Sequence, residues 1–140
     1  MAEVLIGMGS NIEPEKNLLA AATALRGQFG SALFSSVYRS APVGMQGSDF
    51  LNACCWLESD MQAAEIKACL KAMEDAQGRD RSEGSWQPRT LDLDMLMYGG
   101  EVVDDELYQY AHAYVPAAEL VAIELPRDEA NTVTLIELRL

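Results

Sequence analysis

The order of apolar patterns along the 140 residues is the feature that most limits the possible folds. Apolar side chains recur at strand or helix spacing in six consecutive segments: strands over Val4–Met8, Ala32–Arg39, Phe50–Leu57 and Leu91–Met97, and helices that begin near Pro14 and Ser59. Their order is strand, helix, strand, strand, helix, strand, which is the order of a ferredoxin-like sandwich. We therefore predict the α+β class, with helices packed on an antiparallel sheet, in a single domain spanning residues 1–140.

Local signals predict where the two main helices begin and end. Pro14 suits the first turn of a helix, and Gly27 or Gly30 is expected to end it. Ser59 and Gln62 have the spacing of a capping box and are expected to open the second helix.

Weaker signals follow the fourth strand. The pair Gly99–Gly100 is expected to turn the chain into a hairpin partner at Glu101–Val103. Further on, Pro116–Ile123 suits a short helix, and Val133–Leu138 is compatible with either a strand or a helix.

Composition narrows the partners and the compartment. The 22 acidic and 10 basic residues leave a net charge of −12, which repels nucleic acids and anionic lipids, so we expect neither as a partner. The N-terminal segment lacks the basic region of a signal peptide, and no apolar run reaches the length of a membrane span. The three cysteines, Cys54, Cys55 and Cys69, show no disulfide or metal spacing, which is typical of reduced thiols in a cytoplasmic protein.

Asp92 and Asp94 are the most informative polar pair. Residues two apart in a strand project from the same face, so their carboxylates are expected to lie side by side, with Leu91, Leu93 and Met95 on the core face. Two such carboxylates repel each other unless a cation lies between them, and Mg²⁺ prefers oxygen ligands of this kind when it also binds phosphates. The alternative is a solvated acidic face on an edge strand.

The loop before this pair has the opposite charge. Residues 79–89 contain Arg79, Arg81 and Arg89 and carry a net charge of +1 in an otherwise acidic chain. The planar donor group of arginine matches phosphate oxygens two at a time, so the loop and the carboxylates together suit a polyphosphate. Trp86 in a polar loop favours a covering role, whereas the alternative is a solvated turn whose arginines pair with surface acids.

Other nucleotide or catalytic motifs are not found. The chain contains neither GxxxxGK[ST] nor GxGxxG, and its single histidine, His112, forms no nucleophile pattern. His112 is expected either to pack beside its aromatic neighbours or to contact a phosphate.

The segment Trp86–Asp94, WQPRTLDLD, resembles the signature of the 6-hydroxymethyl-7,8-dihydropterin pyrophosphokinase family. The resemblance continues in order through Ile6–Asn11, Ser36–Gly44, Phe50–Asn52, Glu74, Gly78–Arg79, Gly99 and His112. It implies an enzyme of the folate pathway that transfers pyrophosphate from ATP to the hydroxymethyl group of a pterin, with Mg²⁺ as cofactor.

The resemblance also implies roles for individual residues. Asp92 and Asp94 would hold two Mg²⁺ ions that bridge the ATP phosphates, while Arg79 and Arg89 would steady the phosphates during transfer. The remaining ATP contacts would come from Glu74, Arg81, Trp86 and His112, with Trp86 covering the site from a mobile loop, 78–89. The pterin pocket would be formed by Ser40, Val43, Phe50, Asn52 and Trp86.

The chain departs from the family pattern near its C-terminus. Ser82 and Leu107 stand where basic residues are usual, and most of the basic, aromatic loop that follows His112 in the family is missing. Tyr114 is the nearby ring that could replace the lost stacking partner, so we predict that it binds substrate.

Three functions follow from these observations. The first is an active pyrophosphokinase acting on a pterin-like alcohol. The second is a catalytically weak paralogue that binds nucleotide or pterin as a regulatory module, and the third is a ferredoxin-like interaction domain. For the first, we expect ATP and the pterin as ligands of a cytoplasmic monomer.

Overall fold

One antiparallel sheet runs through the part of the chain that the structure, a computed structural model, describes: residues 1–42, 47–78, 91–122, 124, 126 and 132–140. The strands are β1 Ala2–Ser10, β2 Ala32–Phe34, β3 Val37–Ser40, β4 Phe50–Ser59, β5 Asp92–Tyr98, β6 Glu101–Val102 and β7 Thr134–Ile136. The helices are α1 Pro14–Phe29, α2 Ala63–Ala76, α3 Glu106–Gln109 and α4 Ala111–Ala117. The strand order is β6-β5-β1-β4-β3-β7, with β2 pairing with β4.

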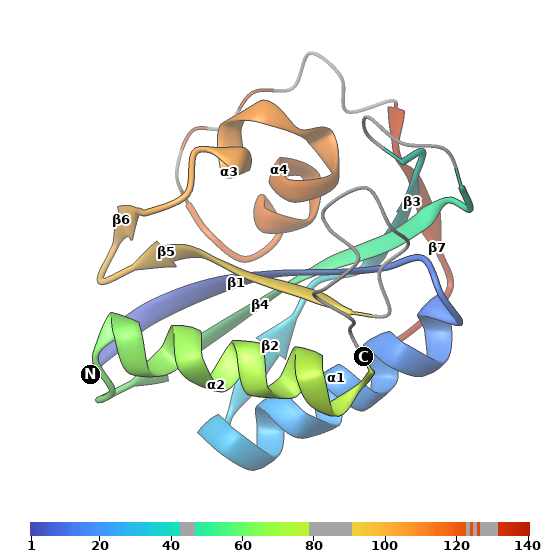
Figure 1. Ribbon diagram of the computed structural model, residues 1–140. Helices are drawn as coiled ribbons and strands as arrows, with labels where there is room; N and C mark the ends of the chain where they lie inside the picture. The colour runs from blue at the N-terminus through green and yellow to red at the C-terminus, as the bar shows by residue number, and fades with distance from the viewer. Residues whose placement is uncertain (43–46, 79–90, 123, 125, 127–131) are drawn as a thin grey trace.

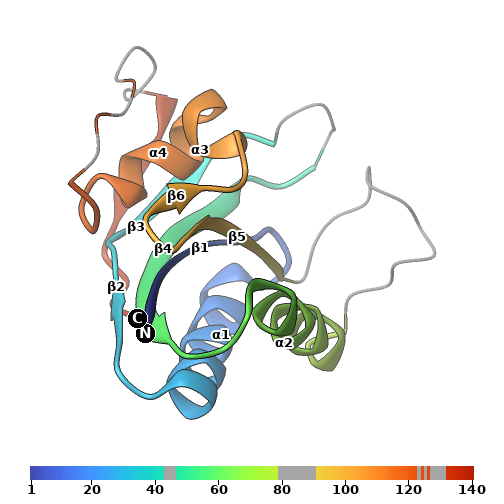
Figure 2. The same ribbon diagram turned by 90° about the vertical axis from the view of Figure 1, so that its left-hand side faces the viewer.

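The helices cover both faces of this sheet. In Figures 1 and 2, α1 and α2 lie against one face, and α3 and α4 lie against the other. The main core lies on the α1 and α2 side, where Ile6, Leu18, Ile66 and Leu93 are buried together. A smaller apolar cluster on the opposite face includes the fully buried Leu107. The predicted α+β class, with helices packed on an antiparallel sheet, is confirmed.

Several predicted boundaries are confirmed. Helix α1 begins at Pro14 and ends at Phe29, with Gly30 directly after it. The β5–β6 hairpin forms as expected, and both Gly99 (φ 63°) and Gly100 (φ 84°) have the positive φ that such a two-residue turn requires. The segment 133–138, which suited either a strand or a helix, contains strand β7.

The predicted strand Ala32–Arg39 is wrong in one respect, because it is two strands. Ser35 and Ser36 lie between β2 and β3 and interrupt the strand. There the hydroxyl of Ser35 accepts a hydrogen bond from the backbone N–H of Cys54 at 2.8 Å. A side chain thus replaces a backbone partner in the ladder, which an alternating pattern does not reveal.

The capping box predicted from Ser59 and Gln62 is also wrong, because the box lies three residues further on. Gln62 precedes α2, and its backbone N–H donates to the carboxylate of Glu65 at 3.1 Å. Ser59 instead ends β4, and its hydroxyl accepts from the N–H of Met61. The same spacing therefore occurs twice, and only tertiary packing selects the second.

The helix predicted over Pro116–Ile123 is wrong in position. Helix α4 begins at Ala111 because the carbonyl of Tyr110 accepts the N–H groups of Ala113 and Tyr114. It ends at Ala117, so Pro116 lies in its last turn. Neither this helix nor any other in the described part of the chain is long and apolar enough to cross a bilayer.

The cysteines are free thiols in the described structure. Cys54 and Cys55 are buried in the sheet, and Cys69 is half-buried on α2. Burial raises the pKa of Cys54 and raises that of Cys55 to about 12, so both remain protonated at neutral pH.

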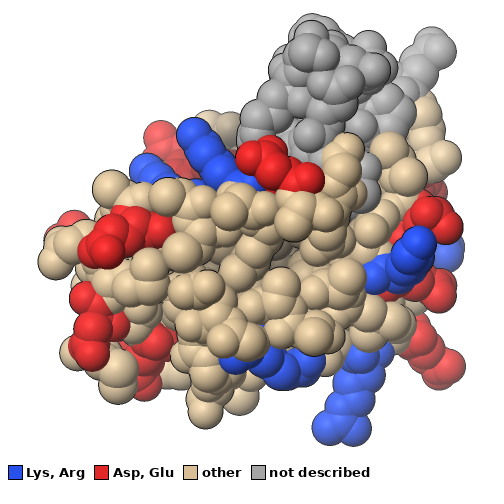
Figure 3. All heavy atoms as spheres, turned by 60° about the horizontal axis from the view of Figure 1, so that its bottom comes forward, with Lys and Arg blue, Asp and Glu red and all other residues tan. Residues whose placement is uncertain are grey.

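Charged residues surround the side of the molecule that carries α1 and α2. Figure 3 shows acidic and basic side chains interspersed around the margin of a largely uncharged surface in this view. The carboxylates that form the candidate site lie on the other face of the sheet.

Candidate active site

A pocket of about 240 Å³ opens on the face of the sheet that α3 and α4 cover. Strands β1, β4 and β5 form its floor, and residues of α3 and α4 form a wall. Six residues predicted from the sequence line it: Ser40, Phe50, Asn52, Asp92, Asp94 and His112. The fold therefore brings three of the predicted pterin residues, both predicted metal ligands and one predicted ATP contact into a single cavity.

Two glycines of β1 form the middle of the floor. Gly9 pairs with Asn52 on one side and Asp92 on the other, and Gly7 lies between Cys54 and Asp94. Residues directly opposite in neighbouring strands project from the same face. Because strands lie about 4.8 Å apart, Asn52 and Asp92 stand two strand spacings apart, with no side chain between them.

The carboxamide of Asn52 is fixed by its surroundings. It is 4% exposed, and its Nδ2 donates to the backbone oxygen of Tyr38 at 3.1 Å and to the hydroxyl of Ser40 at 2.8 Å. Both amide hydrogens are thus engaged within the protein. The carboxamide oxygen is presented on the side of Gly9.

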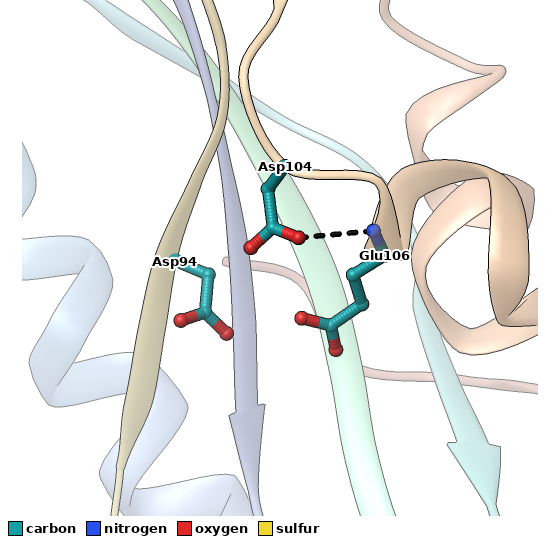
Figure 4. A group of neighbouring side chains, drawn as sticks. All are labelled: Asp94, Asp104 and Glu106. Atoms are coloured by element: carbon teal, nitrogen blue, oxygen red, sulfur yellow. Dashed lines mark hydrogen bonds between the residues drawn. The ribbon is translucent and has the colours of Figure 1, made fainter.

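Three carboxylates converge at the other end of the pocket. Oxygens of Asp94, Asp104 and Glu106 lie within 4.8 Å of one another. Figure 4 shows Asp94 on β5 facing the other two across the gap between β5 and α3. Asp104 and Glu106 were not among the residues predicted from the sequence.

A bulge in β5 places these two additional carboxylates. The register between β1 and β5 shifts so that Leu96 is an extra residue on β5. Its carbonyl accepts the N–H groups of Val103 and Asp104 at 2.9 and 3.4 Å. Asp104 Oδ1 then accepts the N–H of Glu106 at 2.9 Å, which orients the start of α3 towards Asp94.

Burial and neighbouring charge both act on Asp94. Loss of solvent raises its pKa to about 8, with further contributions from the negative charges of Asp92, Glu106, Asp104 and Glu74. A divalent cation would relieve this repulsion, and a set of carboxylate oxygens is the donor set that Mg²⁺ prefers. The residues present at this end of the pocket therefore fit the metal.

The raised pKa of Asp94 predicts how the stability of the metal-free protein depends on pH. The folded protein keeps this carboxyl protonated up to about pH 8, whereas the unfolded chain releases the proton near its ordinary value of 3.8. Between these values the folded state binds more protons, so the free energy of unfolding falls as pH rises, by up to about 1.4 kcal/mol per pH unit. Urea denaturation in EDTA at pH 5 and pH 8 measures this difference. Equal stability in the Asp94→Asn variant and the wild type at both values would contradict the assignment.

Glu74 lies behind the aspartates and does not line the pocket. Its side chain is 3% exposed, and Oε2 accepts the backbone N–H of Leu93 at 2.7 Å. Leu93 stands between Asp92 and Asp94, so this bond connects the end of α2 to the part of β5 that carries them. The ATP contact predicted for Glu74 stays a prediction.

We expect Glu74→Ala to lower the free energy of unfolding by about 1.5–3 kcal/mol, the usual contribution of a hydrogen bond to a charged group. Glu74→Gln keeps an oxygen that can accept the N–H of Leu93, so its free energy of unfolding should fall by less. Urea denaturation of the two variants measures the difference. Equal losses would show that the charge of Glu74, and not its bond to β5, matters for stability.

His112 belongs to the wall of the pocket. Its Nε2 lies 3.4 Å from Glu106 Oε1, and its ring stacks on that of Tyr110 with centroids 5.1 Å apart and planes at 11°. The predicted packing beside an aromatic neighbour is confirmed, while the phosphate contact stays a prediction. Tyr110 also lines the pocket and was not predicted, although its position two residues before the only histidine was a signal.

Among the described residues, Tyr114 is a further predicted site residue that does not line the pocket. It is 4% exposed. The other five lie outside the described residues: Val43, Arg79, Arg81, Trp86 and Arg89.

The fold and the pocket define an α+β protein with a pocket on its antiparallel sheet that contains clustered carboxylates. The sequence model of the family described as 7,8-dihydro-6-hydroxymethylpterin-pyrophosphokinase (HPPK) matches residues 5–131. The chain belongs to this family.

Individual relatives support the same assignment. The chain is 34% identical over 129 residues to a Haemophilus influenzae protein named 2-amino-4-hydroxy-6-hydroxymethyldihydropteridine pyrophosphokinase, with 89% of this chain and 80% of that protein covered. Proteins of the same name from Synechocystis sp. and Bacillus subtilis are 32% and 31% identical. Their alignments cover 95% and 82% of this chain, and 74% and 75% of those proteins.

Proposed function

We propose that the chain transfers pyrophosphate from ATP to the hydroxymethyl group of 6-hydroxymethyl-7,8-dihydropterin, releasing AMP, as a step of folate biosynthesis. One observation carries the proposal. A single pocket joins an acidic end, with Asp92 and Asp94, to an end with an aromatic ring and a fixed amide, Phe50 and Asn52. Membership of the HPPK family supports the choice of reaction.

At the acceptor end, Asn52 and Phe50 recognise the pterin. Since both amide hydrogens of Asn52 are engaged by Tyr38 and Ser40, its oxygen accepts an N–H of the pterin edge. The sequence suggested that Asn52 could both donate to and accept from the pterin, as any asparagine side chain can. The structure leaves only the accepting oxygen for the ligand. The ring of Phe50 supplies a stacking face.

At the nucleotide end, Asp92 and Asp94 would hold the two Mg²⁺ ions that the resemblance implies, and carboxylate oxygens of Asp104 and Glu106 lie within 4.8 Å of one of Asp94. The bound ions would neutralise charge on the phosphates. The hydroxymethyl oxygen attacks the β-phosphorus, and AMP leaves. Arg79 and Arg89 would steady the phosphates, in the roles that the resemblance implies for them.

The proposal is tested by measuring AMP formed from ATP with and without 6-hydroxymethyl-7,8-dihydropterin, in Mg²⁺ and in EDTA. We expect AMP only when both the pterin and Mg²⁺ are present. Calorimetry with a non-hydrolysable ATP analogue measures nucleotide binding separately. Absence of AMP from a chain that binds both ligands would overturn the catalytic proposal.

A regulatory paralogue is the second candidate, and two observations favour it. Tyr114, predicted as a substitute stacking ring, is 4% exposed and is not among the residues that line the pocket. Leu107, which stands where a basic residue is usual, is fully buried in the smaller core cluster. Such a protein would bind Mg²⁺ and nucleotide but release no AMP in the same assay.

A further inference from the structure

Gly9 is a glycine that the backbone and the packing do not require. It lies one residue before the end of β1, and its φ is outside the left-handed region that favours glycine. A Cβ at this position would lie 3.5 Å from Asn52 Oδ1, 3.8 Å from Phe50 Cδ2 and 3.9 Å from the oxygen of Leu51. These are ordinary van der Waals distances, so alanine would fit without moving a neighbour.

Other glycines of the chain have structural explanations. At Gly7, two residues earlier on the same face, a Cβ would lie 3.1 Å from Leu96 Cδ1, so the close approach of β5 favours glycine there. Gly99 and Gly100 have the positive φ of the β5–β6 turn. Gly9 also lines the pocket, as Gly7 does, but neither a close neighbour nor a positive φ explains the glycine there.

The space above Gly9 lies on the path between the two ends of the site. In the sheet, Gly9 separates Asn52 on β4 from Asp92 on β5. Any ligand that contacts the carboxamide of Asn52 and also reaches the carboxylates has to cross the floor over Gly9. A methyl group there would lie against both Asn52 and Phe50, where the ring of the ligand is expected to sit.

We infer that Gly9 determines acceptor specificity: its missing side chain keeps the floor open for a flat ring that lies between Asn52 and Asp92. The inference rests on the proposed function, because it concerns the acceptor of that reaction. Gly9 acts by leaving room and takes no part in bond making. A substitution at Gly9 should weaken binding of the acceptor and leave the affinity for the nucleotide unchanged.

Gly9→Ala tests the inference. We expect the variant to fold with a thermal midpoint equal to or above that of the wild type, since alanine is easier than glycine to hold in a strand. Calorimetry with 6-hydroxymethyl-7,8-dihydropterin, in Mg²⁺ and a non-hydrolysable ATP analogue, should show binding weaker by about tenfold to hundredfold, as when a base loses its stacking face. The affinity for the Mg²⁺-nucleotide should be unchanged. Gly9→Val should bind the pterin more weakly than Gly9→Ala, because its side chain is larger.

Gly27→Ala is the matched control, because Gly27 is exposed on α1 and a Cβ there has no neighbour within 4 Å. It should bind pterin as the wild type does. If Gly9→Ala also binds pterin normally, or if it fails to fold, the inference is wrong and the proposed function stands. If the wild type binds no pterin, the proposed function fails first and the inference fails with it.

Discussion

Replacing Asp94 with asparagine is expected to reduce pyrophosphate transfer by at least about a thousandfold, or about 4 kcal/mol in the activation barrier. Asparagine has the same shape, but it lacks the charge that holds a divalent ion. The metal-free variant should remain folded and be more stable than the wild type at pH 8. Its stability should rise because the change removes one member of a repelling group that includes Asp104 and Glu106.

The measurements are AMP production, Mg²⁺-dependent nucleotide binding and the thermal midpoint in EDTA. Asp60→Asn is a matched control, because the Asp60 side chain is 85% exposed at the end of the sheet away from the pocket. The control should leave all three quantities close to those of the wild type. A large fall in the thermal midpoint of Asp94→Asn would mean that this carboxylate stabilises the fold, and the metal assignment would be withdrawn.

The second large effect is expected at Asn52. The Asn52→Leu variant keeps a similar volume but loses the carboxamide oxygen and the two hydrogen bonds to Tyr38 and Ser40. A ligand N–H left without its acceptor costs about 1–3 kcal/mol, which corresponds to roughly tenfold to hundredfold weaker pterin binding. Calorimetry should detect this loss with Mg²⁺-nucleotide affinity retained. The free energy of unfolding should fall as well.

Asn17→Leu is the control that separates the expected loss of pterin affinity in Asn52→Leu from its expected loss of stability. Asn17 lies on α1, outside the pocket, and is also buried, at 8% exposure. Its Nδ2 donates to the carbonyl of Ile12 at 2.6 Å. This variant should lose stability without losing pterin affinity. If Asn52→Leu and Asn17→Leu behave alike in both measurements, Asn52 supports the fold and does not recognise the ligand.

Local patterns were sufficient for the order of the main elements. The alternation around Asp92 and Asp94 depends only on the two-residue period of a strand, so both the strand and the shared direction of the two side chains could be predicted. Similarly, Pro14 and the Gly99–Gly100 pair act through their own φ angles, which neighbours in space do not alter. The same local reading failed at Gln62, where two overlapping cap spacings competed.

Much of the pocket wall could not be predicted, because it depends on contacts between elements. Asp104 and Glu106 approach Asp94 only because the bulge at Leu96 turns the carbonyl of that residue towards the following segment. Their sequence distance from Asp94 carries no helix or strand period that would place them beside it.

The aromatic residues of this wall illustrate the same limit. Tyr110 and Tyr114 are both close to His112 in the sequence, but the start of α4 turns the Tyr110 ring onto His112 and buries Tyr114. Which face of a short helix meets the sheet is decided by packing, because a helix of seven residues has too few apolar side chains to define a face. The sequence alone therefore specified the strand that carries the aspartates, but it did not show that Gly7 and Gly9 lie within β1 beneath the pocket. Tertiary packing decided which carboxylates and which ring join them.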